Sequence, residues 1–151
     1  LAQRGELLTH HSDRSILTLM SMDSVIQHYN KVLYPDMTLM DIANHVSTSR
    51  YFVFPVVDKQ MKLIGVVYLD DIRHLIFRTE LYRDFRVAQL MKPPVARLSV
   101  QDPMDVVLKV FDRTRMWNLP VVDSEGTFVG FIRKSSVLAV YRQMMADYST
   151  D

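Results

Sequence analysis

The side chains that could carry out chemistry are few and mostly scattered. The chain has no cysteine, which excludes disulfides and thiolate chemistry and favours an intracellular setting. Its one pair of adjacent histidines, His10-His11, is not followed by His, Asp or Glu in a metal-binding pattern. The four glycines are not clustered, so a phosphate-cradling loop is excluded, and no nucleophile–base set is present. The sequence therefore predicts neither catalysis nor a metal site.

One acidic pair stands out from this background. Asp70-Asp71 is the only pair of adjacent acidic residues in the part of the chain expected to fold. It stands at the start of a predicted helix, where a carboxylate stabilises the helix dipole by about 0.3–1 kcal/mol. A helix start also offers N–H groups that suit a phosphate. Arg133 and Lys134, which come just before the corresponding helix start further along the chain, could meet phosphates or simply form a solvated strand end.

The two helix starts correspond because the chain contains one pattern twice. The run 54–58 (Phe-Pro-Val-Val-Asp) returns as 119–123 (Leu-Pro-Val-Val-Asp), and Gly65 returns as Gly130. Self-similarity of this length predicts one structural unit built twice and packed on itself. A ligand or partner would then be expected in a cleft between the copies.

The first copy is predicted to fold as a helix, a strand pair and a closing helix. Thr38 can cap a helix over 39–46, whose apolar residues recur at helical spacing. The β-rich runs 52–57 and 63–68 bracket a short polar turn and predict a hairpin. The closing helix begins near Asp70 and is amphipathic.

The second copy predicts the same order of elements. Asp102 is the candidate N-cap of its first helix, and Pro103 is placed at the first helical position. The strands are predicted over 118–122 and 127–133, and the closing helix begins near Ser135. Two aromatic residues at corresponding places in the two copies are expected to pack against the fold and not to serve as stacking platforms: Phe52 and Trp117.

Composition and patterning set the expected organisation. The chain has 151 residues, 48% hydrophobic and 23% charged, with a net charge of +1, which is typical of a globular domain and gives no basic face for nucleic acid. It has no apolar run as long as the ~18–20 residues of a membrane helix, and it begins without Met, as a piece of a longer polypeptide would. The expected segments are an arm over 1–15, a first repeat over 16–78, a connector over 79–86, a second repeat over 87–146 and a tail over 147–151.

The repeated unit resembles the CBS domain, named after cystathionine β-synthase. It carries Pro, two valines and Asp, then a short turn, a glycine within an apolar strand, and Asp at a helix start, as in 55–71. Two copies in tandem resemble the CBS pair, or Bateman module. The resemblance implies an α/β fold with two pseudo-symmetric βαββα-type halves related by a pseudo-twofold axis, and a regulatory module that is not an enzyme. It also implies a homodimer through the closing helices.

The CBS resemblance also suggests a ligand. CBS pairs that hold adenosine compounds usually place Thr or Ser three residues before an Asp, whose carboxylate accepts hydrogen bonds from both ribose hydroxyls. Here Asp71 is present, but Tyr68 takes the hydroxyl position and either points its phenol into the pocket or fills the space of adenine. Phe54 borders the adenine pocket in such pairs and is also expected to be core. In the second copy Arg133 and Ser136 occupy the two positions, so the carboxylate is absent there. The resemblance thus implies one candidate site for ATP, ADP or AMP.

A narrower resemblance concerns the parent protein. The segments 16–20, 54–58 and 65–73 together are similar to the cytoplasmic tail of bacterial CLC-type chloride channels and transporters. This implies a membrane-embedded transport domain in the same polypeptide and a place on the cytoplasmic side of the cell membrane. Two alternatives remain: a nucleotide-sensing regulatory module of an enzyme, and a structural dimerisation module with vestigial pockets. The ion-binding CBS pair of a magnesium transporter would need an acidic cluster beyond Asp70-Asp71.

Overall fold

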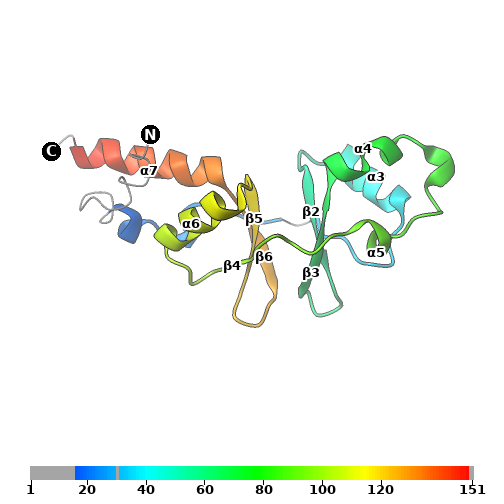
Figure 1. Cartoon of the computed structure of the whole chain (residues 1–151), viewed down its shortest axis with the longest axis horizontal. Coiled ribbons are helices and arrows are strands. Elements are labelled where there is room, and N and C mark those ends of the chain that lie inside the picture. The colour runs from blue at the N-terminus through cyan, green and yellow to red at the C-terminus, as the bar shows by residue number, and fades with distance from the viewer. Residues whose placement is uncertain (1–15, 30, 150–151) are drawn as a thin grey trace. The chain divides into compact units, whose positions relative to one another are not determined.

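A computed structural model describes residues 16–29 and 31–149, so the predicted arm with His10-His11 lies outside the described residues. The fold is mixed α/β, as predicted, and both copies contain a helix, a hairpin and a closing helix (Figure 1). After a helical turn over 16–19 the elements are η1 (Met22–Ser24), β1 (Ile26–Gln27), α3 (Leu39–Ser47), β2 (Val53–Val57), β3 (Leu63–Tyr68), α4 (Leu69–Ile76), η2 (Thr79–Leu81), α5 (Val87–Leu90), β4 (Leu98–Ser99), α6 (Met104–Thr114), β5 (Asn118–Val122), β6 (Phe128–Arg133) and α7 (Lys134–Ser149). None of the described helices is both long and apolar enough to cross a membrane.

The chain divides into two compact units, and neither is a continuous stretch of sequence. The first, here called the α4 unit, contains residues 29–95 and 124–128. The second, called the α7 unit, contains residues 16–28, 96–123 and 129–149 of the described chain. The α4 unit thus includes residues 124–128 from the second hairpin, and the α7 unit includes the segment that opens the first repeat.

The α4 unit is built on the β2–β3 hairpin and two helices. Thr38 and Asp41 form a capping box at the start of α3: the Thr38 side chain accepts the Asp41 N–H at 3.4 Å, and the Asp41 carboxylate accepts the Thr38 N–H at 2.9 Å. Every residue of β2 is buried, and α3 and α4 lie side by side (Figure 1). The core residues of this unit form one cluster: Leu33, Leu39, Ile42, Phe54, Val56, Val67, Leu69, Ile72, Ile76 and Val87.

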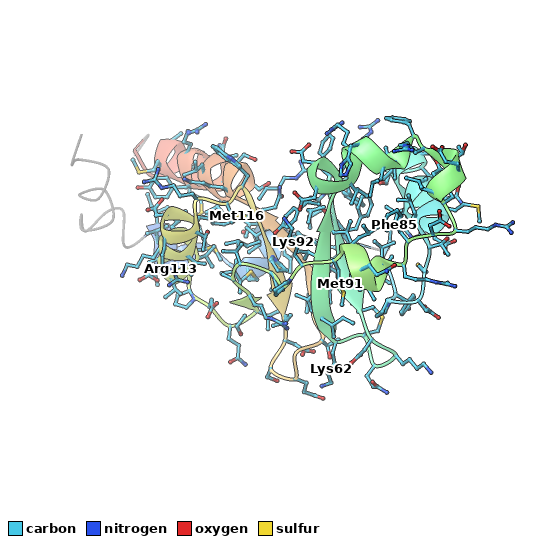
Figure 2. The ribbon with its side chains drawn as sticks, turned by 45° about the vertical axis from the view of Figure 1, so that its right-hand side comes forward. Lys62, Phe85, Met91, Lys92, Arg113 and Met116 are labelled. Atoms are coloured by element: carbon cyan, nitrogen blue, oxygen red, sulfur yellow. The ribbon has the colours of Figure 1, made fainter. Side chains whose placement is uncertain are left out.

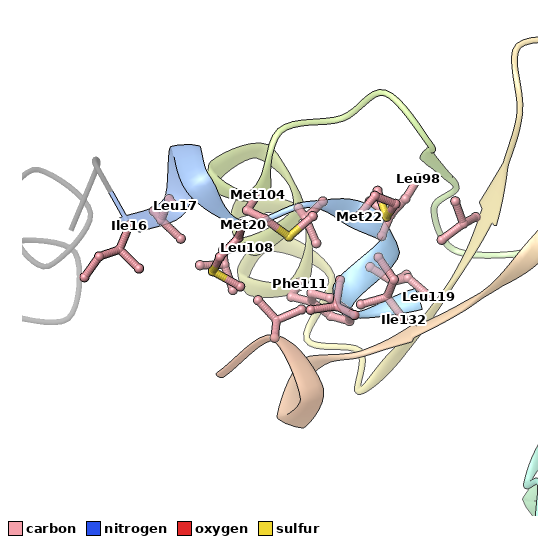
Figure 3. Packing of buried hydrophobic residues seen from close by; sticks show 14 residues of the cluster. Ile16, Leu17, Met20, Met22, Leu98, Met104, Leu108, Phe111, Leu119 and Ile132 are labelled. Atoms are coloured by element: carbon pink, nitrogen blue, oxygen red, sulfur yellow. The ribbon is translucent and has the colours of Figure 1, made fainter. Parts of the chain in front are cut away.

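The α7 unit holds a four-stranded sheet in the order β1-β6-β5-β4. Phe111 of α6 packs in the same cluster as Leu119 of β5 and Ile132 of β6 (Figure 3). The segment 16–25 adds five buried residues to this cluster: Ile16, Leu17, Met20, Met22 and Val25. The opening residues of the predicted first repeat are thus part of the core of the α7 unit.

Each hairpin pairs with a short strand or bridge from the opening segment of the other repeat. Gln27 of β1 lies opposite Phe131 of β6 in antiparallel register. In the α4 unit Lys92, 65 residues after Gln27, forms an antiparallel bridge to Val66, 65 residues before Phe131. The exchange is therefore reciprocal, and nothing in the local sequence pattern predicted it, because strands of one or two residues carry no periodicity.

Two details of the prediction were wrong. Asp102 is not the N-cap of α6: that position is Pro103, and the Asp102 carboxylate instead accepts the N–H of Ser99 at 2.8 Å. Phe52 and Trp117 are not core residues, since they are 68% and 72% exposed. Each lies directly before the first strand of its hairpin. Its backbone carbonyl accepts the N–H of the first residue of the closing helix, at 2.8 Å for Phe52 and 2.9 Å for Trp117. The aromatic side chains therefore stand outside the core.

Candidate functional site

The candidate site lies where β3 ends and α4 begins. Tyr68 is the N-cap residue of α4, and no described side chain caps this helix start. Asp70 and Asp71 both belong to the first turn, but they differ in surroundings. Asp70 is 87% exposed and pairs with Arg73 on the same helix at 2.7 Å. Asp71, at 37% exposure, is more enclosed. Asp71 is therefore the carboxylate that faces the rest of the α4 unit.

Asp71 has a partner from a distant segment. Its Oδ2 lies 2.8 Å from the Nζ of Lys92. Lys92 follows α5 on the segment that runs beside β3 (Figure 2), and its backbone exchanges two 2.8 Å hydrogen bonds with Val66. Sequence reasoning missed Lys92 because the exchanged strand that carries it was not predicted.

Tyr68 has a phenol that stays protonated at neutral pH. Burial raises the pKa of Tyr68 above its ordinary value of 10.0, and the negative charge of Asp71 raises it further. Both effects oppose the phenolate, the first because a charge is poorly solvated in the interior and the second because like charges repel. The phenol is thus a neutral hydrogen-bond donor beside the Asp71 carboxylate.

Phe54 and Arg133, the other two predicted site residues, have different settings. Phe54 is fully buried in the core of the α4 unit, and its ring meets that of His45 edge-on at 6.5 Å. Arg133 is an exposed residue at the end of β6 and belongs to the α7 unit. The structure therefore brings Asp71, Tyr68 and Phe54 into one unit and places Arg133 in the other. A role for any of the four at a ligand stays a prediction.

The corresponding helix start in the α7 unit has different chemistry. α7 begins at Lys134, whose Nζ lies 3.6 Å from a carboxylate oxygen of Asp112 and 5.7 Å from the centre of the Trp117 ring. Ser136 occupies the place of Asp71, and Gln27 the place of Lys92. Both members of the acid–base pair found in the α4 unit are thus replaced by neutral residues.

An open pocket of about 310 Å³ in the α7 unit is lined by Leu17, Thr18, Met20, Pro103, Met104, Asp105 and Lys109. It contains none of the predicted site residues. Within residues 16–29 and 31–149, no group of three or more His, Asp or Glu side chains could hold a metal ion.

Comparison with known proteins gives the same unit twice. The family model of the CBS domain matches residues 20–78 and 87–143. The inosine-5'-monophosphate dehydrogenase of Methanocaldococcus jannaschii is 24% identical over 145 residues, which are 91% of this chain and 28% of that protein. The chain thus spans little more than a quarter of the length of this curated relative.

Solved structures show the same fold. The crystal structure of CBSX2 in complex with AMP has a TM-score of 0.68 and 23% identity, and the match covers 82% of this chain and 96% of that one. The CBS domain of a bacterial CNNM/CorC family Mg²⁺ transporter in complex with ATP has a TM-score of 0.73 and 21% identity, over 93% and 97% of the two chains. With both halves matched by one family model, the chain belongs to the CBS domain family and is a tandem CBS pair.

Proposed function

We propose that this CBS pair is a regulatory module that binds an adenine nucleotide at the start of α4. The observation that carries the proposal is the Asp71 carboxylate in the first turn of α4, beside the neutral phenol of Tyr68. A carboxylate can accept hydrogen bonds from both hydroxyls of a ribose, and such charge-assisted bonds are strong. The N–H groups and positive dipole end of the same helix suit the phosphate.

The differences between the two copies set the stoichiometry. In the α7 unit Ser136 replaces the carboxylate, and Arg133 replaces the tyrosine. A serine hydroxyl cannot accept two ribose hydroxyls with the strength of a carboxylate. The module therefore binds one nucleotide per chain, at Asp71.

The comparisons support the ligand class without specifying it for this chain. One structural neighbour was solved with AMP and another with ATP. Both are adenine mononucleotides, which differ only in the number of phosphates. ATP, ADP and AMP are therefore the ligands proposed here, and the module itself has no catalytic role.

We further propose that the module forms a homodimer through its closing helices and serves a larger polypeptide. The parent proposed first is a CLC-type chloride channel or transporter, with this module on the cytoplasmic side of the cell membrane below a membrane-embedded domain. Its support is the likeness of segments 16–20, 54–58 and 65–73 to that family. The second candidate is a regulatory module of an enzyme, which the match to a dehydrogenase favours. Membrane fractionation of the full-length polypeptide separates the two, since only the transporter would sediment with the lipid.

The nucleotide proposal is tested by calorimetric titration with ATP, ADP, AMP and adenosine, with and without magnesium. The Asp71→Asn variant removes the charge of the ribose acceptor and should abolish saturable binding. Asp70→Asn is the matched control, because it removes one negative charge from the same helix turn at a side chain that is 87% exposed. Binding retained in Asp71→Asn, or lost equally in both variants, would contradict the assigned role of Asp71.

A further inference from the structure

We propose that Lys92 makes the α4 site selective for phosphorylated adenosine over free adenosine, by moving from Asp71 to the phosphate when the ligand binds. This inference rests on the proposed function and adds to it the residue that recognises the phosphate. Its starting point is the 2.8 Å ion pair between Lys92 Nζ and Asp71 Oδ2. In this ion pair Lys92 contacts the same carboxylate that is proposed to accept hydrogen bonds from the ribose hydroxyls.

The backbone of Lys92 is fixed by strand pairing, whereas its side chain is held only by an exposed ion pair. Two 2.8 Å backbone hydrogen bonds tie Lys92 to Val66, two residues before Tyr68. Gly65 allows this approach, since a Cβ at that position would stand 3.2 Å from the Lys92 carbonyl oxygen. The side chain of Lys92, in contrast, is 59% exposed. The ammonium can therefore change partners without any change in the sheet.

The ion pair is weak enough to exchange. Pairs between side chains this accessible to water contribute little, because solvent screens the attraction and two long side chains lose freedom. A phosphate monoester carries more charge than a carboxylate and offers three acceptor oxygens, so it attracts an ammonium more strongly. A lysine ammonium on a flexible stem is suited to such a change of partner.

Adenosine and AMP then differ in the anionic partner that they offer to the Lys92 ammonium. Adenosine takes up the Asp71 carboxylate and leaves the ammonium with a weakened partner. AMP takes up the same carboxylate and supplies a new anion. The positive charge of Lys92 therefore favours binding of the nucleotide over binding of the nucleoside.

The second copy supports treating the two residues as a functional pair. Gln27 forms with Phe131 the same backbone bridge that Lys92 forms with Val66. The strand geometry is thus kept in the α7 unit, while the lysine and the carboxylate are both absent. Because Gln27 forms this bridge without a lysine, the strand pairing itself does not require the ammonium of Lys92.

The test compares AMP and adenosine binding to the wild type, Lys92→Met and Lys59→Met by calorimetry at two salt concentrations. Lys92→Met keeps the aliphatic stem and both backbone hydrogen bonds, so the fold is retained. Lys59→Met removes the same charge from the exposed β2–β3 turn, at the far end of the hairpin from Tyr68. In Lys92→Met we expect AMP affinity to fall about tenfold or more, because one charge-assisted bond is lost. Adenosine affinity should change by no more than about twofold, since adenosine gives Lys92 no new anion, and the salt dependence of AMP binding should decrease.

The outcomes separate this inference from the proposed function. If Lys92→Met binds AMP and adenosine as the wild type does, or weakens both equally, Lys92 does not read the phosphate, while nucleotide binding still stands. An equal loss in Lys59→Met would show a general effect of net charge and would also overturn the assignment. A wild-type protein that binds neither ligand would refute the proposed function and this inference with it.

Discussion

Gly65 and Gly130 each lie directly beneath a strand that crosses from outside their own hairpin. A Cβ on Gly65 would stand 2.9 Å from the Met91 sulfur and 3.2 Å from the Lys92 carbonyl oxygen. A Cβ on Gly130 would meet the backbone carbonyl of Gln27. Neither glycine has a left-handed backbone, so both are needed for close approach and not for conformation. The repeated glycine therefore marks the reciprocal strand exchange.

Alanine substitutions should distinguish the two roles that glycine has in this chain. Gly126 has a φ of +83° with open space around it, so Gly126→Ala should cost about 1 kcal/mol through backbone strain alone. Gly130→Ala must displace β1, because its new Cβ meets backbone atoms, and should cost more, about 2–3 kcal/mol. The free energy of unfolding in urea, measured for each variant, checks this order. Equal costs would show that β1 does not approach Gly130 in solution.

Local patterns made much of this architecture predictable, but the pairing between distant segments was not. The hairpins and helices follow from alternation and 3.6-residue periodicity, and Thr38 was identified as a cap from its place before an apolar stripe. Strands such as β1 have two residues and pair over about a hundred positions of sequence, which no local signal records. The same gap explains the site: Asp71 was predicted from its position in the CBS-like pattern, whereas Lys92 reaches Asp71 only through the strand exchange.

The capping box of α3 should be measurable as a stability effect. Thr38→Ala removes the oxygen that accepts the Asp41 N–H and should lower the free energy of unfolding by about 1 kcal/mol. Thr38→Ser keeps an acceptor at the same place and should cost much less. Chemical denaturation of both variants tests this. A Thr38→Ser variant as unstable as Thr38→Ala would assign the loss to the missing methyl group instead.

Trp117 is the only tryptophan in the chain and reports directly on the corner before β5. Because its side chain is 72% exposed, we expect red-shifted emission and efficient quenching by acrylamide in dilute protein. If the proposed homodimer covers this corner, the emission should shift to the blue as protein concentration rises, in step with the mass measured by sedimentation. Blue emission with poor quenching in a monomer would contradict the exposed position.

The ionisation of Tyr68 offers a test of the site that needs no ligand. Its pKa is raised first by burial and then by the Asp71 charge, so Asp71→Asn should lower the pKa of Tyr68 toward 10.0 without reaching it. Tyrosine labelled with ¹³C at Cζ, titrated by NMR, resolves this residue once Tyr68→Phe has identified its signal. Asp70→Asn is the control and should leave the Tyr68 titration unchanged.

The raised pKa of Tyr68 determines whether stability rises or falls with pH in the alkaline range. A tyrosine whose pKa is higher in the folded state holds its proton more tightly there, so its contribution is fully present below pH 10. That contribution is lost as pH rises through the folded-state pKa, because the unfolded chain gives up the proton first. The free energy of unfolding should therefore decrease above about pH 10, and the decrease should be smaller in Tyr68→Phe. A wild type and a Tyr68→Phe variant with the same alkaline slope would show that the phenol is not held neutral by its surroundings.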